Sequence, residues 1–174
     1  MPLKDKIYLI GFMGSGKSTT GRRLAAGLGW YFIDLDRKIE EETGLRVPEL
    51  FSRYGESGFR ETEARVLKAL RPVSGTVIST GGGAPCFGNN MQFMLETGLT
   101  IYLKLTPAQL KKRLETSRTE RPLLKGVSRE SLLDFISGKL SEREQWYSMA
   151  EMTIDGTYTE YASLVTMIRQ YFDR

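Results

Sequence analysis

The sequence lacks histidine altogether and contains a single cysteine, Cys86. Without histidine, the protein has neither the commonest general base nor the commonest metal ligand. Any acid–base step must therefore fall to carboxylates, lysine or the substrate itself. One cysteine forms no internal disulfide, which is typical of proteins kept in a reducing compartment.

Long hydrophobic runs are also missing. No apolar stretch approaches the about 20 residues that a membrane-spanning helix needs, and residues 1–6 lack the apolar core of a secretory signal. We therefore expect a cytoplasmic protein without a membrane partner. The chain of 174 residues shows no repeat, linker or low-complexity segment, so residues 1–174 are predicted to form one domain.

An excess of positive charge is absent from most of the chain. The net charge is +4, and residues 111–125 hold six Lys or Arg against two Glu, which accounts for the whole excess. A confined basic segment suits small anions such as phosphates. Nucleic-acid binding usually needs a wider basic face, so we expect small-molecule partners and no nucleic acid.

The strongest motif that is present is a glycine-rich stretch at residues 11–18. It has the spacing G-x-x-x-x-G-K-S, follows the apolar run 7–10 and precedes a predicted helix at 19–28. Strand, glycine loop and helix in this order predict a phosphate-binding loop rather than a plain turn with a solvated lysine. Lys17 would reach the β- and γ-phosphates, and Ser18 would offer its hydroxyl to Mg²⁺. The predicted ligand is a nucleoside triphosphate, bound by Gly14, Ser15, Gly16, Lys17, Ser18 and Thr19.

Strand-like and helix-like segments alternate along the chain, which indicates an α/β fold with a parallel sheet covered on both faces. The strand candidates are residues 7–10, 31–33, 76–79, 100–105 and 152–154. Thr106, followed by Pro107 and then Gln109, is typical of a helix start with a capping box. Ser128 is predicted to cap a helix from about residue 129 to 149.

Two long segments interrupt this alternation, at about residues 36–69 and 116–127. Gly44, Gly55 and Gly58 are expected to divide the first into short helical pieces. Long insertions in a compact α/β domain are usually binding segments or lids. We therefore expect a substrate-binding insertion followed by a lid.

Asp34 and Asp36 end the second strand candidate. Strand alternation would place both carboxylates on one face, at the carboxyl edge where open α/β sheets bind ligands. One carboxylate could support Mg²⁺ while the other accepts a hydrogen bond from the hydroxyl to be phosphorylated. The alternative is structural, because aspartate is a common helix cap at such a junction.

Three consecutive glycines and three arginines complete the candidate residues. Gly81, Gly82 and Gly83 follow the third strand candidate, where they form either a close-approach turn for an anion or hydroxyl or merely a flexible turn. The arginines are Arg60, Arg121 and Arg143. Their forked donors suit carboxylates and phosphates, but composition alone does not distinguish them from surface arginines.

Taken in order, these motifs resemble those of the shikimate kinase family, which are phosphate-loop small-molecule kinases of the nucleoside-monophosphate-kinase-like superfamily. The resemblance runs from about Ile7 to Ile154. The phosphate loop is shared by many nucleotide-binding proteins, whereas the other elements together are much more specific. The matching elements are Gly11-x4-Gly-Lys-Ser18, Asp34-x-Asp36, Phe59-Arg60-x2-Glu63, Gly81-Gly-Gly83, Arg121-Pro-Leu-Leu124 and Arg143-x3-Tyr147.

The resemblance implies a three-layer α/β/α fold with a five-stranded parallel sheet. It also implies a kinase activity. The expected reaction transfers the γ-phosphoryl group of ATP to the 3-hydroxyl of shikimate, in the chorismate pathway to aromatic amino acids. The catalytic residues would be Lys17, Asp36 and Arg121. Asp36 orients or deprotonates the hydroxyl, and Arg121 is the lid arginine that closes onto the nucleotide phosphates.

The same resemblance assigns the ligand contacts. Arg60 and Arg143 would clamp the shikimate carboxylate, and Phe59 would pack against its ring. The turn at Gly81, Gly82 and Gly83 would face the same ligand, and Asp36 its hydroxyl. Asp34 would support Mg²⁺ alongside Ser18. Relatives of this kind are usually monomeric, and we carry that expectation over.

Some positions depart from the family pattern. Either Arg113 or Arg118 could lie against adenine, and residues 154–157 lack the arginine that some relatives carry there. Trp146 replaces a smaller apolar residue, which we interpret as a packing difference. The competing hypotheses are a related kinase for gluconate or a nucleoside monophosphate, and a nucleotide-binding module without catalysis.

Overall fold

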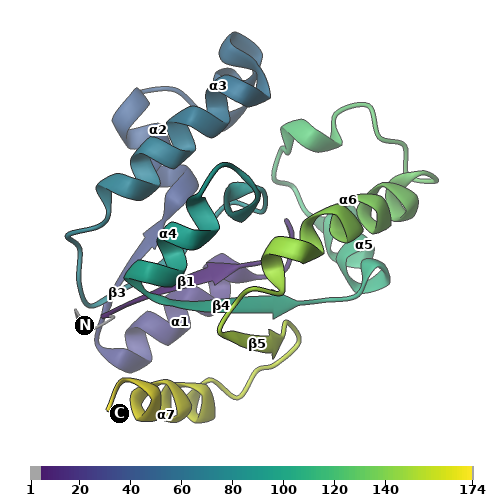
Figure 1. The fold of residues 1–174 in the computed structure, drawn as a ribbon. Helices are drawn as coiled ribbons and strands as arrows, with labels where there is room; N and C mark the ends of the chain where they lie inside the picture. The colour runs from purple at the N-terminus through teal and green to yellow at the C-terminus, as the bar shows by residue number, and fades with distance from the viewer. Residues whose placement is uncertain (1–4, 174) are drawn as a thin grey trace.

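The structure, a computed structural model, describes residues 5–173. Residues 1–4 and 174 belong to the predicted domain but lie outside the described part, and so does most of the segment 1–6, in which no secretory signal is expected. Within residues 5–173, five strands form one parallel sheet in the order β2-β3-β1-β4-β5 (Figure 1). The strands are β1 (Lys6–Ile10), β2 (Tyr31–Asp34), β3 (Thr76–Ser79), β4 (Leu99–Lys104) and β5 (Met152–Asp155).

The strand predictions are confirmed to within one residue at each end. β1 lies in the middle of the sheet, where Ile7 stands opposite Val77 of β3 and Leu99 of β4. Because every pairing is parallel, all strands end at the same edge. The α/β sheet inferred from the alternation is therefore correct.

Helices join the strands and cover both faces of the sheet. The α-helices are α1 (Lys17–Leu28), α2 (Leu35–Thr43), α3 (Val47–Ala69), α4 (Asn90–Thr97), α5 (Pro107–Thr116), α6 (Leu132–Tyr147) and α7 (Tyr161–Phe172), and two short 3₁₀ helices are η1 (Ala84–Cys86) and η2 (Pro122–Leu124). Across residues 5–173, no helix is both long and apolar enough to cross a membrane.

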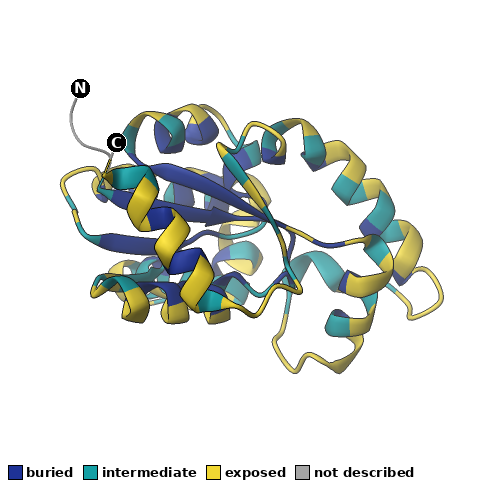
Figure 2. Ribbon diagram, turned by 90° about the horizontal axis from the view of Figure 1, so that it is seen from below, coloured by how far each residue is buried: buried dark blue, intermediate teal, exposed yellow. Residues whose placement is uncertain are grey.

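Alternation along β1 divides the core into two clusters. Ile7 and Leu9 pack with α1 and α7 on one face of the sheet, whereas Tyr8 and Ile10 pack with α3, α4 and α6 on the other. Figure 2 shows the buried strands between helices whose outer sides are exposed. Both faces are thus closed, which leaves the edge of the sheet for a site.

The two predicted helix starts have different outcomes. Thr106 caps α5 as expected, because its hydroxyl accepts from the Gln109 N–H at 3.3 Å and the Gln109 side chain accepts from the Thr106 N–H at 2.9 Å. The Ser128 prediction is wrong, since α6 begins at Leu132. The Ser128 hydroxyl instead accepts from the Ser131 N–H at 3.2 Å, which holds a turn before the helix.

The segment predicted at 36–69 consists of α2 and a long, kinked α3. Gly44 ends α2 in the left-handed conformation with φ of 70°, and Gly55 kinks α3 with φ of 68° and ψ of 179°. Gly58 lies inside the helix, so its predicted break is wrong. Figure 1 shows α2 and α3 beyond the sheet edge, with the loop that carries η2 facing them.

Candidate active site

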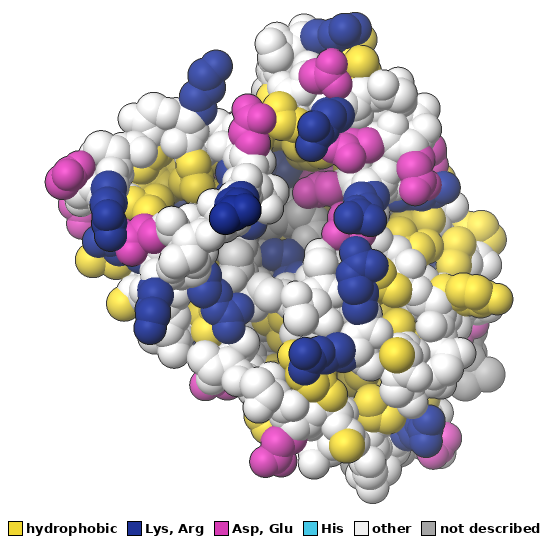
Figure 3. Space-filling view, turned by 180° about the vertical axis from the view of Figure 1, so that it is seen from behind, with side chains coloured by type: hydrophobic (Ala, Val, Ile, Leu, Met, Phe, Trp, Pro, Cys, Tyr) yellow, Lys and Arg dark blue, Asp and Glu magenta, His cyan; other side chains and the backbone are white. Residues whose placement is uncertain are grey.

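A cleft of about 980 Å³ opens at the carboxyl edge of the sheet. Its walls are the phosphate loop, α2 and α3, the glycine turn after β3, and the segment around η2. Figure 3 shows this hollow, with Lys and Arg side chains around its rim and acidic side chains beside them. Ligands of open α/β sheets bind at this edge.

The phosphate loop begins where β1 ends and leads into α1. Gly16 adopts the left-handed conformation with φ of 91°, which a residue with a side chain rarely takes. Lys17 follows it and is 8% exposed. Its ammonium donates to the carbonyls of Gly11 at 2.8 Å and Phe12 at 2.9 Å. Burial, reinforced by nearby Arg121, lowers the pKa of Lys17 to about 7.

Asp34 uses its two carboxylate oxygens for different partners. Oδ1 accepts from the backbone N–H groups of Asp36 at 3.1 Å and Arg37 at 3.3 Å, so it caps α2. Oδ2 accepts from the Ser18 hydroxyl at 2.8 Å. The capping alternative is therefore correct for Asp34, and it coexists with a link to the phosphate loop.

Asp36 lies in the first turn of α2 and not on the strand. β2 ends at Asp34, so the strand-alternation argument for the pair is wrong. The turn of helix nevertheless brings Asp36 into the cleft. Burial and the neighbouring Asp34 carboxylate raise the pKa of Asp36 to about 6. Such a shift at a cleft is typical of groups that handle protons or hydroxyls.

Arg60, on α3, is held by acidic residues of its own helix. Its Nη1 donates to Glu63 Oε1 at 2.8 Å, and its Nη2 lies 3.4 Å from Glu56 Oε1. Glu63 is fully buried, and burial raises its pKa to about 7 although Arg60 acts in the other direction. The sequence motif contains Glu63, but no role was predicted for it. Its spacing of three residues after Arg60 on a helix was the available signal.

Arg143 extends into the cleft from α6 and is 5% exposed. Its Nη1 and the Nε of Arg121 are buried atoms without a hydrogen-bond partner within residues 5–173. Buried polar groups normally have partners, so a ligand that supplies acceptors would satisfy these two donors, and the unpartnered Glu63 Oε2 in the same cleft would accept from a ligand hydroxyl. The Arg143 guanidinium also lies over the Phe12 ring, 5.5 Å from its centre.

The glycine turn lies between the two arginines. A Cβ atom on Gly83 would collide with the Arg60 guanidinium, and one on Gly82 would lie 3.3 Å from Arg143 Nη1 and 3.1 Å from the Met13 nitrogen. On Gly81 it would lie 2.8 Å from Glu63 Oε2. Glycine is therefore needed at these positions because neighbouring groups approach the backbone closely, and not because the turn must be flexible.

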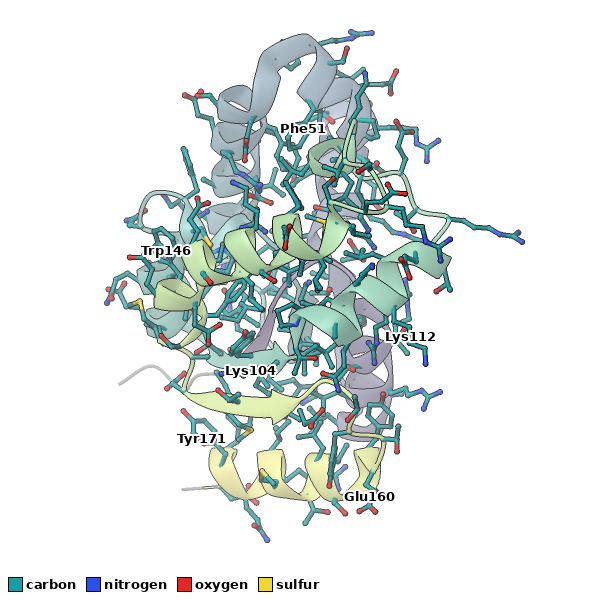
Figure 4. The ribbon with its side chains drawn as sticks, turned by 90° about the vertical axis from the view of Figure 1, so that its right-hand side faces the viewer. Phe51, Lys104, Lys112, Trp146, Glu160 and Tyr171 are labelled. Atoms are coloured by element: carbon teal, nitrogen blue, oxygen red, sulfur yellow. The ribbon has the colours of Figure 1, made fainter. Side chains whose placement is uncertain are left out.

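Phe51 and Phe59 form part of the apolar lining of the cleft. Phe59 is buried, and its ring centre lies 4.6 Å from that of Phe51. In Figure 4, Phe51 lies among the side chains beside α2, α3 and η2. Trp146 lies near the end of α6 and packs against the core, which agrees with a packing difference.

Almost all of the predicted site residues converge on this cleft. Those that line it are Gly14, Gly16, Lys17, Ser18, Thr19, Asp34, Asp36, Phe59, Arg60, Gly81, Gly82, Gly83, Arg121 and Arg143. Ser15 does not line it, because it is buried and its N–H donates to the Phe12 carbonyl at 3.1 Å.

Comparison with known proteins shows the family to which the chain belongs. The shikimate kinase family model matches residues 13–172. The shikimate kinase of Parabacteroides distasonis is 45% identical over 150 residues, which cover 86% of this chain and 87% of the relative. The chain belongs to the shikimate kinase family.

Solved shikimate kinases share the whole fold. The crystal structure of the Bacteroides thetaiotaomicron shikimate kinase is 40% identical, with a TM-score of 0.88 over 97% of this chain and 98% of that one. The Acinetobacter baumannii shikimate kinase, solved in complex with shikimate, is 36% identical, with a TM-score of 0.83 over 96% and 92%. The fold expected from the resemblance is thus confirmed.

The oxygen donors near the phosphate loop fit a Mg²⁺ ion that arrives with a nucleotide. Mg²⁺ is usually held by one or two protein oxygens together with phosphates and water. The Ser18 hydroxyl and the Asp34 carboxylate are such oxygens. Over the described chain, no group of three or more His, Cys, Asp or Glu side chains could hold a metal by itself.

The raised pKa of Asp36 predicts a pH-dependent stability. Between pH 3.8, the ordinary pKa of aspartate, and about pH 6, the folded protein keeps a proton that the unfolded chain releases. The free energy of unfolding should therefore fall as the pH rises through this window, and Asp36→Asn should show a smaller fall. Urea denaturation across the window measures this difference.

The exposed Glu130, outside the cleft, provides the matched control, because Glu130→Gln also exchanges a carboxyl for an amide. This control should keep the wild-type slope. An Asp36→Asn protein whose stability falls as steeply as that of the wild type would contradict the assignment.

Proposed function

We propose that this protein transfers the γ-phosphoryl group of ATP to the 3-hydroxyl of shikimate, giving shikimate 3-phosphate and ADP. Family membership supports the reaction, and the cleft supports the assignment of its parts. One observation supports the proposal most directly. Arg60 and Arg143 approach the glycine turn within the cleft that is also lined by Lys17 and Ser18. A carboxylate subsite thus lies beside a phosphate site.

The acid subsite would bind shikimate through charge and shape together. Arg60 and Arg143 would hold the carboxylate, because a guanidinium donates two parallel hydrogen bonds to such a group. The unpartnered Nη1 of Arg143 supports this role. Phe59 would pack against the ring, and the glycine turn would offer backbone N–H groups to the same ligand.

The phosphate side would stabilise the charge that is transferred. Lys17 and Arg121 would contact the phosphates, and the backbone of the loop would surround them. Ser18 and Asp34 would hold Mg²⁺, which when bound neutralises phosphate charge. Phosphoryl transfer depends mainly on such positioning and charge stabilisation, so the absence of histidine is no obstacle. Residues 116–127 would act as the lid that carries Arg121.

Asp36 lies between the two subsites and would contact the acceptor hydroxyl. Its raised pKa supports a group that accepts a proton or holds the hydroxyl through a hydrogen bond. For adenine, Arg113 is better placed than Arg118. Arg113 Nη2 donates to the Gly156 carbonyl at 3.1 Å and Nη1 to the Gly14 carbonyl of the phosphate loop at 3.5 Å, whereas Arg118 is exposed. We propose a monomer on the expectation carried over from the family.

The acceptor can be identified by measuring ADP release with a panel of candidates. We expect shikimate to support turnover, and quinate, gluconate and nucleoside monophosphates to support far less. Preference for gluconate or a nucleoside monophosphate would favour the related-kinase alternatives. Nucleotide binding without turnover on any acceptor would favour the non-catalytic alternative, and either result would contradict the proposal.

Arg60→Lys tests the carboxylate clamp while keeping a positive charge beside buried Glu63. The variant loses the forked donor, so the KM for shikimate should rise about ten- to hundredfold while the KM for ATP stays nearly constant. Steady-state kinetics with each substrate varied in turn measures both constants. Arg65→Lys, on the exposed side of the same helix, is the matched control. Equal losses for both substrates would place Arg60 outside the acid subsite.

A further inference from the structure

Tyr147, the last residue of α6, forms a hydrogen bond that connects this helix with the glycine turn. The side chain is fully buried, and its hydroxyl donates to the Gly82 carbonyl. Burial also raises the pKa of Tyr147, so the hydroxyl keeps its proton and remains a donor. The roles proposed above for the cleft do not use this residue.

The carbonyls of the glycine turn are each satisfied in a different way. Ala84 donates its N–H to the Gly81 carbonyl at 3.1 Å, and Cys86 donates to the Gly83 carbonyl at 3.0 Å. These two bonds belong to the turn itself. The Gly82 carbonyl is bound by a side chain from a distant part of the chain. Tyr147 therefore supplies the bond that the turn does not make for itself.

The hydrogen bond to the Gly82 carbonyl also fixes the orientation of the Gly83 N–H. The Gly82 C=O and the Gly83 N–H belong to one planar peptide group, so the orientation of the first sets that of the second. Within residues 5–173, neither the Gly82 N–H nor the Gly83 N–H donates to another protein group. Both are free for a ligand beside Arg60 and Arg143.

Tyr147 is itself held in place by its neighbours. Its ring centre lies 5.0 Å from that of Tyr102, whose hydroxyl donates to Glu144 Oε2 at 3.0 Å. Arg143 precedes Tyr147 by four residues on α6, so both side chains extend from the same face of the helix. One rigid helix face therefore delivers the arginine to the cleft and the hydroxyl to the turn.

We propose that Tyr147 is a positioning residue for the acid subsite. Its hydroxyl sets the plane of the Gly82–Gly83 peptide and keeps the turn at a fixed position relative to Arg143. Without that hydroxyl the Gly82 carbonyl loses its partner, the peptide plane can rotate, and shikimate meets a misaligned donor. Within residues 5–173, no hydrogen bond joins Tyr147 to the phosphate loop, so we expect nucleotide binding to stay intact. This inference rests on the proposed function.

The test compares Tyr147→Phe with Tyr8→Phe. Each variant removes one buried hydroxyl and keeps the ring in the same core cluster. The Tyr8 hydroxyl bonds to Thr97 Oγ1 at 2.9 Å, and neither residue lines the cleft. Tyr8→Phe therefore controls for the loss of a core hydrogen bond. The measurements are kcat, the KM for each substrate, the calorimetric Kd for shikimate, and Tm.

For Tyr147→Phe we expect the KM and the Kd for shikimate to rise about tenfold, with the KM for ATP changed less than about twofold. For Tyr8→Phe we expect a lowered Tm with both KM values near those of the wild type. An unchanged shikimate KM in Tyr147→Phe would overturn the proposal. So would an equal rise for ATP, or the same rise in Tyr8→Phe.

Wild-type protein measured in parallel separates this inference from the function on which it rests. Shikimate-dependent ADP release by the wild type, with no change in Tyr147→Phe, would overturn the role of Tyr147 alone. A wild type that releases no ADP with shikimate would overturn the proposed function and this inference with it.

Discussion

The site depends on positive side chains buried at the sheet edge with too few acids to neutralise them. Arg60 has a buried partner in Glu63, but Arg143 and Arg121 each keep a buried nitrogen without a partner in the described chain. Unpaired buried charge is unfavourable unless a ligand supplies the opposite charge. The cleft therefore favours anionic ligands.

The parallel sheet provides this arrangement because all of its strands end at one edge. β1 leads into the phosphate loop, β2 into the Asp34 cap, and β3 into the glycine turn. α3 and α6 then bring Arg60 and Arg143 from opposite sides toward that turn. The phosphate loop, Asp36 and the two arginines thus share one cleft, which is the arrangement that the proposed transfer to a hydroxylated acid requires.

The sequence predicted the sheet and the phosphate loop well, because both depend on local patterns. Asp36 was placed in the right cleft for a wrong reason, since the Asp34 cap starts the helix earlier than strand alternation suggested. Ser128 is of a residue type that caps helices, but its hydroxyl accepts from the Ser131 N–H in a turn, and the helix starts at Leu132. The role of Tyr147 depends on Gly82, a partner that only the folded chain brings near, whereas the pairing of Glu63 with Arg60 follows from their spacing of three residues on one helix.

The most direct test of the buried positive charge compares shikimate with its methyl ester, which is neutral and nearly the same shape. Isothermal titration calorimetry measures the affinity of the protein for each. Because hydrogen bonds to charged groups contribute roughly 1.5–3 kcal/mol, the ester should bind about ten- to hundredfold more weakly. Equal affinities would contradict the account, since the arginines would then play no part in recognising the carboxylate.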